Sequence, residues 1–210
     1  MTAPLEIEVK FHVSDKQALL EKLHDIGAVS KGKVHEYNLC FDDDQKHLTR
    51  EKRLLRLRKA DKTTLTVKNP PDDNKTKPGM SIDFKVYEEI EVCVDDFDAM
   101  SSILRFLGFS PVQVYEKLRE TFMLKNTVLC LDELPYGMFL EIEGLPDAIV
   151  KTAERLGLAW NERICATYLF MFETLRRILK IGFYDLTFEN FSKVRVDFEK
   201  YRHLFIAGPS

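Results

Sequence analysis

The sequence of 210 residues lacks several features that would assign it quickly to a class. No apolar run approaches the ~18–20 residues that a membrane-spanning helix needs. The start, MTAPLEIEVK, has neither the basic nor the apolar region of a signal peptide. We therefore expect a cytoplasmic protein with no membrane partner. The formal net charge is only −3, so the charge balance does not suggest a nucleic-acid partner either.

Residue clusters that usually carry chemistry are also missing. The four cysteines are widely spaced, with no Cys-x-x-Cys pair and no Cys/His cluster, so neither a zinc site nor a disulfide framework is indicated. The five histidines have no serine or cysteine partner at a suggestive spacing, which leaves nucleophilic catalysis without support. No glycine-rich phosphate loop occurs, which excludes the usual P-loop route to nucleotides.

One short step, Glu-Ile-Glu, occurs three times, at 6–8, 89–91 and 141–143. Each copy is followed by an amphipathic helical pattern with Asp or Ser near its start and Gly at its end, which are cap signals. These patterns span 14–27, 95–108 and 145–157. The repeated unit is therefore a strand followed by a helix, at the level of supersecondary structure.

Further strands alternate polar and apolar residues between these units. Hairpins are expected at Asp61-Lys62 and at 135–137, and 69–81 reads as a polar, proline-rich loop. We count about eight strands, mostly antiparallel. A fourth helix is predicted after Tyr168 and packs on the body. We assign 1–181 to one domain and 182–210 to a C-terminal extension of unknown role.

Charged residues share one face of several predicted strands, because side chains alternate across a strand. The same-face sets are Glu6, Glu8 and Lys10; Arg56 and Arg58; Thr66 and Lys68; Lys85, Glu89 and Glu91; Lys117 and Arg119; Glu141 and Glu143. A plain sheet with one face in water would also alternate. However, like charges paired on one strand repel each other, and three amphipathic helices need an apolar sheet surface to cover. We therefore predict an α+β fold, an eight-stranded antiparallel β-barrel with a charged lumen, clad by amphipathic helices.

Charges in a lumen are costly unless they are paired or ligated. Carboxylates bind hard cations such as Mg²⁺ or Mn²⁺, often together with substrate phosphates. Arg and Lys pairs bind phosphate oxygens through charge-assisted hydrogen bonds. A polyphosphate that a metal bridges to the glutamates, and that the cations hold, fits both charge sets.

The ordered motifs resemble the CYTH domain of the triphosphate tunnel metalloenzymes. EIEVK at 6–10 matches the ExExK signature. YNLCFD, LRLR, LTVK, EEIEV, EKLR, LDELPYGMFLEIEG and ATYLFMF follow in order over about 170 residues. The resemblance implies an eight-stranded tunnel that binds a triphosphate with Mg²⁺ or Mn²⁺. Tyr87 stands where relatives commonly carry Arg, and Lys85 is the candidate replacement.

Pairing and resemblance together give the expected site. The metal ligands are Glu6, Glu8, Glu141 and Glu143, with Glu89 and Glu91 as second-site or water-mediated ligands. The substrate-binding residues are Lys10, Arg56, Arg58, Lys68, Lys85, Lys117 and Arg119. Of these, Lys10, Arg58 and Lys68 are assigned as catalytic.

Three groups of residues near these motifs are either given two possible roles or left out of the expected site. Asp132 either orients a basic group or a ligating carboxylate, or is a turn residue at a strand end. Asp42 to Asp44 read as an acidic turn, although Asp42 matches a family position. Lys52 and Arg53 are left outside the site as a solvated basic stretch.

Three functional classes remain open. The first is metal-dependent hydrolysis of ATP, thiamine triphosphate or tripolyphosphate. The second is a class IV adenylyl cyclase, and the third is a non-catalytic polyphosphate-binding module. Hydrolysis is favoured because cyclisation needs a purine pocket that holds the 3′-hydroxyl in line with the α-phosphorus, and no sequence stretch clearly provides one. A homodimer is left open.

Overall fold

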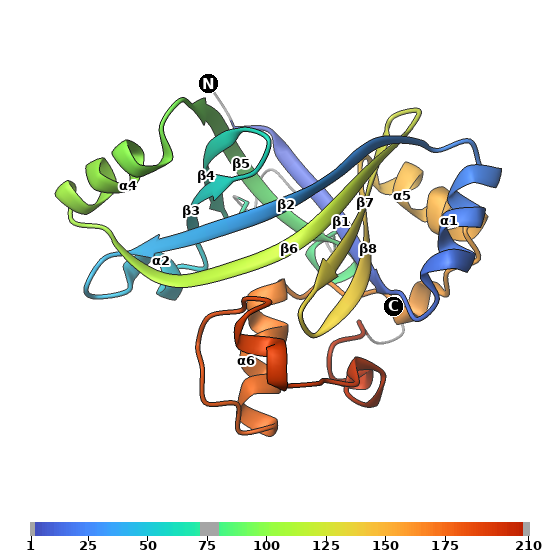
Figure 1. The fold of residues 1–210 in the computed structure, drawn as a ribbon. Coiled ribbons are helices and arrows are strands. Elements are labelled where there is room, and N and C mark those ends of the chain that lie inside the picture. The colour runs from blue at the N-terminus through green and yellow to red at the C-terminus, as the bar shows by residue number, and fades with distance from the viewer. Residues whose placement is uncertain (1–2, 72–79, 208–210) are drawn as a thin grey trace.

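A computed structural model describes residues 3–71 and 80–207, and it confirms the closed antiparallel barrel (Figure 1). The strands are β1 (Leu5–His12), β2 (Val29–Asp42), β3 (Leu54–Lys59), β4 (Thr63–Asn69), β5 (Lys85–Val94), β6 (Ser110–Leu124), β7 (Thr127–Leu134) and β8 (Gly137–Glu143). Their order around the ring is β1-β5-β4-β3-β2-β6-β7-β8. Both predicted hairpins form, between β3 and β4 and between β7 and β8. In the described part of the chain, no helix is long and apolar enough to cross a membrane.

The three predicted helices after the Glu-Ile-Glu strands are present as α1 (Lys16–Asp25), α4 (Phe97–Phe106) and α5 (Pro146–Arg155). Asp15 and Asp96 cap α1 and α4 by accepting hydrogen bonds from backbone amides three residues on. The prediction that a side chain caps α5 is wrong, because the residue before this helix is Leu145, and α5 has Pro in its first turn instead. The helices end before Gly27, Gly108 and Gly157, which adopt the positive φ that glycine tolerates best.

Two short helices join the strands. They are α2 (His47–Arg50), between β2 and β3, and α3 (Met80–Asp83), before β5. Residues 72–79 of the predicted loop 69–81 lie outside the described residues. Helix α3 starts at Met80, so the last two residues of the predicted loop are helical.

The apolar residues of the strands face outward, as the sequence predicts. Ile7, Val9 and Ile142 form one core with Leu23 of α1 and Ile149 of α5. A second core on the outer surface joins β2 and β3 to α4. The helices thus cover apolar strand faces, and the opposite, charged faces line the lumen.

The segment after the barrel packs on the body, as predicted for its first helix, α6 (Tyr168–Ile178). Beyond α6 the chain runs along β6, where Leu186 forms a parallel bridge with Tyr115. Phe191, Phe198 and Phe205 of this tail join a core with residues of α6. That core also includes inner-face residues of four strands, namely Cys40, Tyr115, Leu134 and Phe139. Helix α6 and the tail therefore cover one end of the barrel (Figure 1).

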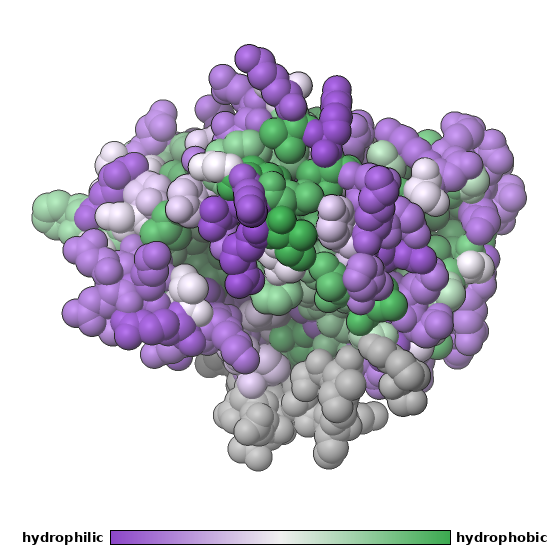
Figure 2. Space-filling view, turned by 90° about the horizontal axis from the view of Figure 1, so that it is seen from below, coloured by the Kyte–Doolittle hydropathy of each residue, from purple (hydrophilic) through white to green (hydrophobic). Residues whose placement is uncertain are grey.

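The face of the molecule formed by α6 and the tail carries both hydrophobic and hydrophilic side chains (Figure 2). Figure 2 views the molecule from this side and shows hydrophobic side chains gathered toward the middle, with hydrophilic ones around the periphery.

Candidate functional site

The lumen contains a cavity of about 830 Å³. All thirteen charged residues that the sequence assigns to the site line this cavity: Glu6, Glu8, Lys10, Arg56, Arg58, Lys68, Lys85, Glu89, Glu91, Lys117, Arg119, Glu141 and Glu143. Strand alternation therefore places the whole predicted set on the inner wall of one barrel.

The Glu-Ile-Glu strands are neighbours in the ring, because β1 pairs with β5 on one side and with β8 on the other. Glu8 lies opposite Lys85 in the first pairing and opposite Glu143 in the second. Three segments that are far apart in sequence thus build one acidic wall. The name acidic wall is used for the lumen-facing glutamates of β5, β1 and β8, which are Glu6, Glu8, Glu89, Glu91, Glu141 and Glu143.

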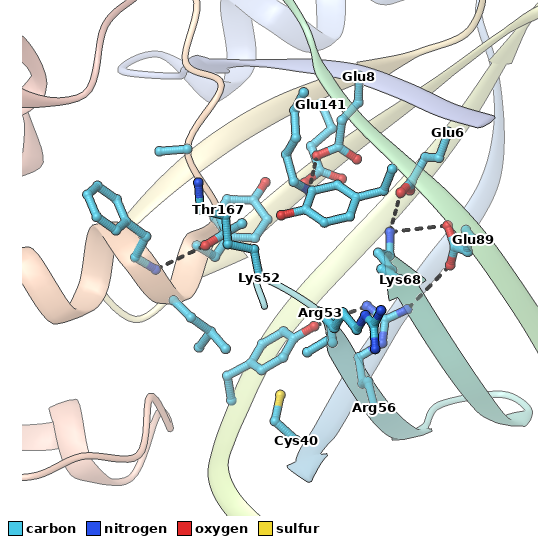
Figure 3. A pocket seen from close by; sticks show the side chains of 18 of the residues that line it. Glu6, Glu8, Cys40, Lys52, Arg53, Arg56, Lys68, Glu89, Glu141 and Thr167 are labelled. Atoms are coloured by element: carbon cyan, nitrogen blue, oxygen red, sulfur yellow. Dashed lines mark hydrogen bonds and ion pairs between the residues drawn. The ribbon is translucent and has the colours of Figure 1, made fainter. Parts of the chain in front are cut away.

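Lysines from the same region already pair with most of the acidic wall (Figure 3). Glu8 contacts Lys10 and, at 2.8 Å, Lys85. Lys10 also lies 3.2 Å from Glu141. Burial and the repulsion from Glu141 both act to raise the pKa of Glu8. The attraction of Lys10 and Lys85 is larger than these two effects, so the pKa lies below its ordinary value. The acidic wall is therefore a network of ion pairs.

Lys68 of β4 joins two more carboxylates to this network. Its ammonium contacts Glu6 and lies 3.1 Å from Glu89. Arg56 approaches Glu89 at 3.9 Å and Glu91 at 3.6 Å. Burial and the nearby Glu8 nevertheless keep the pKa of Glu6 above its ordinary value.

Glu143 differs from the rest of the acidic wall. No ion pair or hydrogen bond joins its side chain to another described residue. Burial, followed by repulsion from Glu6, Glu8 and Glu141, raises its pKa to about 7. The crowding of carboxylates thus makes Glu143 retain its proton up to a higher pH than an ordinary glutamate does.

The part of the lumen next to the acidic wall is organised by Asp132 of β7, which pairs with β8. Its carboxylate is fully buried and accepts hydrogen bonds from Lys117 (3.0 Å), from Arg119 Nε (2.6 Å) and from the Tyr168 hydroxyl of α6 (2.9 Å). Asp132 lies inside β7 and not at a strand end, so the turn alternative is wrong and the orienting role is the one that the contacts support.

Sequence reasoning missed Glu36 of β2. It is 3% exposed and lies 3.2 Å from Arg58, 3.5 Å from Lys117 and 3.8 Å from Arg119. Burial opposes its ionisation, but these cations and Arg56 lower its pKa to about 2. The available signal was alternation, which puts Glu36 on the inner face with Asn38. Asn38 accepts a hydrogen bond from Arg58 at 2.8 Å.

Two residues that the sequence left outside the site lie in the cavity wall. Lys52 and Arg53 precede β3 and are exposed, as expected of a solvated basic stretch, but they also line the cavity. They follow a turn and no strand period, so no pattern signalled their position. Asp42, in contrast, is structural, because it accepts hydrogen bonds from Leu48 and Thr49 of α2. Tyr87 does line the cavity, with the Lys85 ammonium 5.2 Å from its ring centre.

The donor chemistry of the acidic wall fits a hard divalent cation, since carboxylate oxygens are the ligands that Mg²⁺ and Mn²⁺ prefer. Glu143 forms no ion pair with another described residue, which also fits. Within 3–71 and 80–207, however, no three acidic, His or Cys side chains already converge as a ligand set. Lys10, Lys68 and Lys85 hold the oxygens of their neighbours instead.

The CYTH domain family model matches residues 4–164, and the chain belongs to this family. A protein from Methanocaldococcus jannaschii, provisionally named an adenylate cyclase, is 28% identical over 66% of this chain and 76% of its own length. A Vibrio parahaemolyticus structure with the same provisional name aligns with a TM-score of 0.71, at 20% identity, over 81% of this chain and 99% of its own. A Hippeastrum protein, described as a provisional adenylyl cyclase with a dominant triphosphatase activity, aligns with a TM-score of 0.56, at 20% identity, over 80% and 95% of the two chains.

Proposed function

We propose that the protein hydrolyses a triphosphate held in the lumen, with Mg²⁺ or Mn²⁺ as cofactor. The observation that carries the proposal is the pair of charge sets that line one cavity. Six glutamates and seven cations from the predicted set meet there, and most of them are buried or half-buried. So many charges inside a protein are costly unless a ligand or a partner offsets them, and a metal–triphosphate complex carries the complementary charges of both sets.

In this proposal the cations bind and orient the phosphates. Arg56, Arg58, Lys117 and Arg119 supply fixed donors, because Asp132, Glu36 and neighbouring side chains hold them in place. Two buried polar atoms, Arg56 Nε and Glu36 Oε2, have no hydrogen-bond partner among the described residues. Arg56 Nε is thus available to a phosphate oxygen.

The three residues assigned as catalytic, Lys10, Arg58 and Lys68, would stabilise negative charge that develops on the phosphate oxygens. When a phosphate replaces the glutamates as partner of Lys10 and Lys68, the glutamates are released as ligands. Glu6, Glu8, Glu141 and Glu143 would then hold the metal, and Glu89 and Glu91 would be ligands of a second metal ion or bind the metal through water. When bound, the metal supplies positive charge at the phosphate oxygens and can activate a water molecule.

Relatives support two reactions. The Methanocaldococcus and Vibrio names favour conversion of ATP to cyclic AMP and pyrophosphate, whereas the Hippeastrum description favours triphosphate hydrolysis. We place hydrolysis first because it needs only a water near the terminal phosphorus, whereas cyclisation also needs the ribose 3′-hydroxyl in line, roughly 3–3.5 Å from the α-phosphorus.

The test is to incubate the purified protein with ATP, thiamine triphosphate and tripolyphosphate under Mg²⁺ and Mn²⁺, and to separate the products by chromatography. Orthophosphate with a diphosphate supports the proposal. Cyclic AMP with pyrophosphate as main products would overturn it in favour of the cyclase, and tight binding without turnover would favour the binding module. Arg58→Ala should lose most of the activity of the wild type in either enzymatic case, which excludes a contaminating phosphatase.

A further inference from the structure

One buried carboxylate contacts the phosphate-binding cations without reaching the cavity itself. Arg58, Lys117 and Arg119 line the cavity, whereas Glu36 of β2 does not. Glu36 is 3% exposed. Its oxygens lie 3.2 Å from Arg58, 3.5 Å from Lys117 and 3.8 Å from Arg119. Because these cations both line the cavity and contact Glu36, the carboxylate lies behind them as seen from a bound ligand.

Glu36 differs from Asp132, the other buried carboxylate behind these cations. Asp132 accepts hydrogen bonds from Lys117 at 3.0 Å and from Arg119 Nε at 2.6 Å, which fix both donors. Glu36 lies farther from its cations, and its Oε2 has no hydrogen-bond partner among the described residues. Burial opposes the ionisation of Glu36, but the cations lower its pKa to about 2. Glu36 therefore contributes mainly a negative charge, which is present at neutral pH.

Arg58 depends on Glu36 more than the other two cations do. Both of the others also form ion pairs with Asp132. In the part of the chain that the structure describes, Glu36 is the one carboxylate that forms an ion pair with Arg58. Arg58 Nε also donates a hydrogen bond to Asn38, which lies two residues beyond Glu36 and is fully buried. Strand β2 thus places one charged and one neutral side chain behind Arg58.

We propose that Glu36 limits the affinity of the lumen for phosphate groups and thereby allows the product to leave. This inference rests on the proposed binding of a triphosphate in the lumen. The Glu36 charge repels a phosphate that is bound on the other side of the cations, and it also holds Arg58 in place for the reaction. Its removal should therefore tighten the binding of substrate and product while it slows turnover. A carboxylate that only supported the fold would act in the opposite direction on binding, because its loss would disorder the cations.

Two substitutions of nearly unchanged shape test this charge in both directions. Glu36→Gln removes it, and the dissociation constants of tripolyphosphate and pyrophosphate should fall by roughly 10- to 100-fold, the repulsion expected between unit charges about 6–8 Å apart at an effective dielectric constant of about 20. We expect kcat to fall about fivefold or more, because the product leaves more slowly and Arg58 loses its carboxylate. Asn38→Asp adds a second charge beside Arg58 and should raise both dissociation constants. The double variant keeps one charge and should bind within about threefold of the wild type.

The affinities are measured by calorimetric titration with tripolyphosphate and with pyrophosphate, without added metal, and kcat with the substrate that the wild type hydrolyses fastest. Glu133→Gln is the matched control, since Glu133 also contacts two cations, Lys16 and Lys33, but does not line the cavity. It should leave affinity and kcat within about twofold of the wild type. If Glu36→Gln is too unstable for calorimetry, the increase of its Tm with added tripolyphosphate reports the affinity. If it does not fold, Asn38→Asp decides alone.

Tighter binding with slower turnover in Glu36→Gln, together with weaker binding in Asn38→Asp, supports the proposal. Unchanged or weaker binding in Glu36→Gln, tighter binding with unchanged kcat, or unchanged binding in Asn38→Asp would overturn it. If the wild type binds triphosphates but hydrolyses none, the proposed reaction fails, and the affinities alone decide the role of Glu36. If turnover is present and the two charge changes leave the affinities unaltered, only the role of Glu36 fails.

Discussion

Replacing Asp132 by Asn should destabilise the ligand-free protein more than any ordinary surface change. The Asp132 carboxylate is fully buried and has three hydrogen-bond donors, of which two are the cations Lys117 and Arg119. Asn has nearly the same shape but no charge, and its amide group would present hydrogen atoms to those cations. The variant thus isolates the charge of Asp132 from its volume.

The magnitude follows from the neighbours that would remain. Removing one partner of a buried ion pair typically costs about 3–5 kcal/mol. Arg119 also contacts Glu141, and Lys117 lies 3.5 Å from Glu36, so both cations keep a carboxylate nearby. We therefore expect a loss near the lower end, about 3 kcal/mol. For a chain of 150–250 residues, 1 kcal/mol lowers the Tm by about 2–4 °C, which gives a decrease of roughly 6–12 °C.

The assay is thermal unfolding, followed by circular dichroism in metal-free buffer without phosphate. Asp44→Asn is the control, because Asp44 is exposed and the same substitution there should change stability by less than about 0.5 kcal/mol. A decrease in Tm of less than 2 °C for Asp132→Asn would refute the reasoning, since it would mean that the lumen cations do not depend on this carboxylate.

Two further predictions concern the acidic wall. The folded-state pKa of Glu143 is raised to about 7 from an ordinary value of 4.5. The folded state therefore binds more protons than the unfolded state between these pH values, and stability is lost as the pH rises from about 4.5 to 7. In metal-free buffer the Tm of Glu143→Gln minus that of the wild type should increase from pH 5 to pH 8, and a constant difference would contradict the assignment. Lys10 and Lys85 form ion pairs with Glu8 and so compete with a metal ion for its oxygens. The affinity of the protein for Mn²⁺ should therefore be about 5- to 150-fold lower without a non-hydrolysable triphosphate than in its presence. Equal affinities in a paramagnetic-resonance titration would show that the lysines do not compete with the metal.

The residues of the lumen were predictable because strand alternation is a local property. Once the segment that contains Arg56 is recognised as a strand, Arg58 must lie on the same face, because side chains alternate along a strand. Both side chains then point into the lumen when the sheet closes. The contacts of Glu36 were less accessible, because they depend on the register of β2 against β6, in which Glu36 lies opposite Lys117. Lys52 and Arg53 follow no period, and only the path of the turn before β3 brings them to the cavity.

The C-terminal tail shows a different limit. Its residues have no helical or strand period that would place them, yet Phe191, Phe198 and Phe205 are all buried. Phe191 packs against Phe172 of α6, with ring centres 5.8 Å apart, and Phe198 stacks on Phe205, with ring centres 5.6 Å apart. Aromatic side chains bury a large area each, so a few of them can order a segment that has little secondary structure. The positions of such residues depend on the surface they meet, and that surface exists only after the barrel has closed.

Closure also explains why the same Glu-Ile-Glu step occurs three times. The three copies fall on β5, β1 and β8, which are adjacent in the ring although about 50–80 residues separate successive copies in the chain. In each copy the glutamates face the lumen while the isoleucine faces outward, where α1 and α5 bury Ile7 and Ile142. Outward packing thus fixes the register that brings like charges together, and like charges on neighbouring strands repel. Lysines form ion pairs with most of these carboxylates but not with Glu143, whose pKa is raised to about 7. The packing energy of the outer core therefore holds the carboxylates so close together that Glu143 retains a proton near neutral pH, which a bound cation would replace.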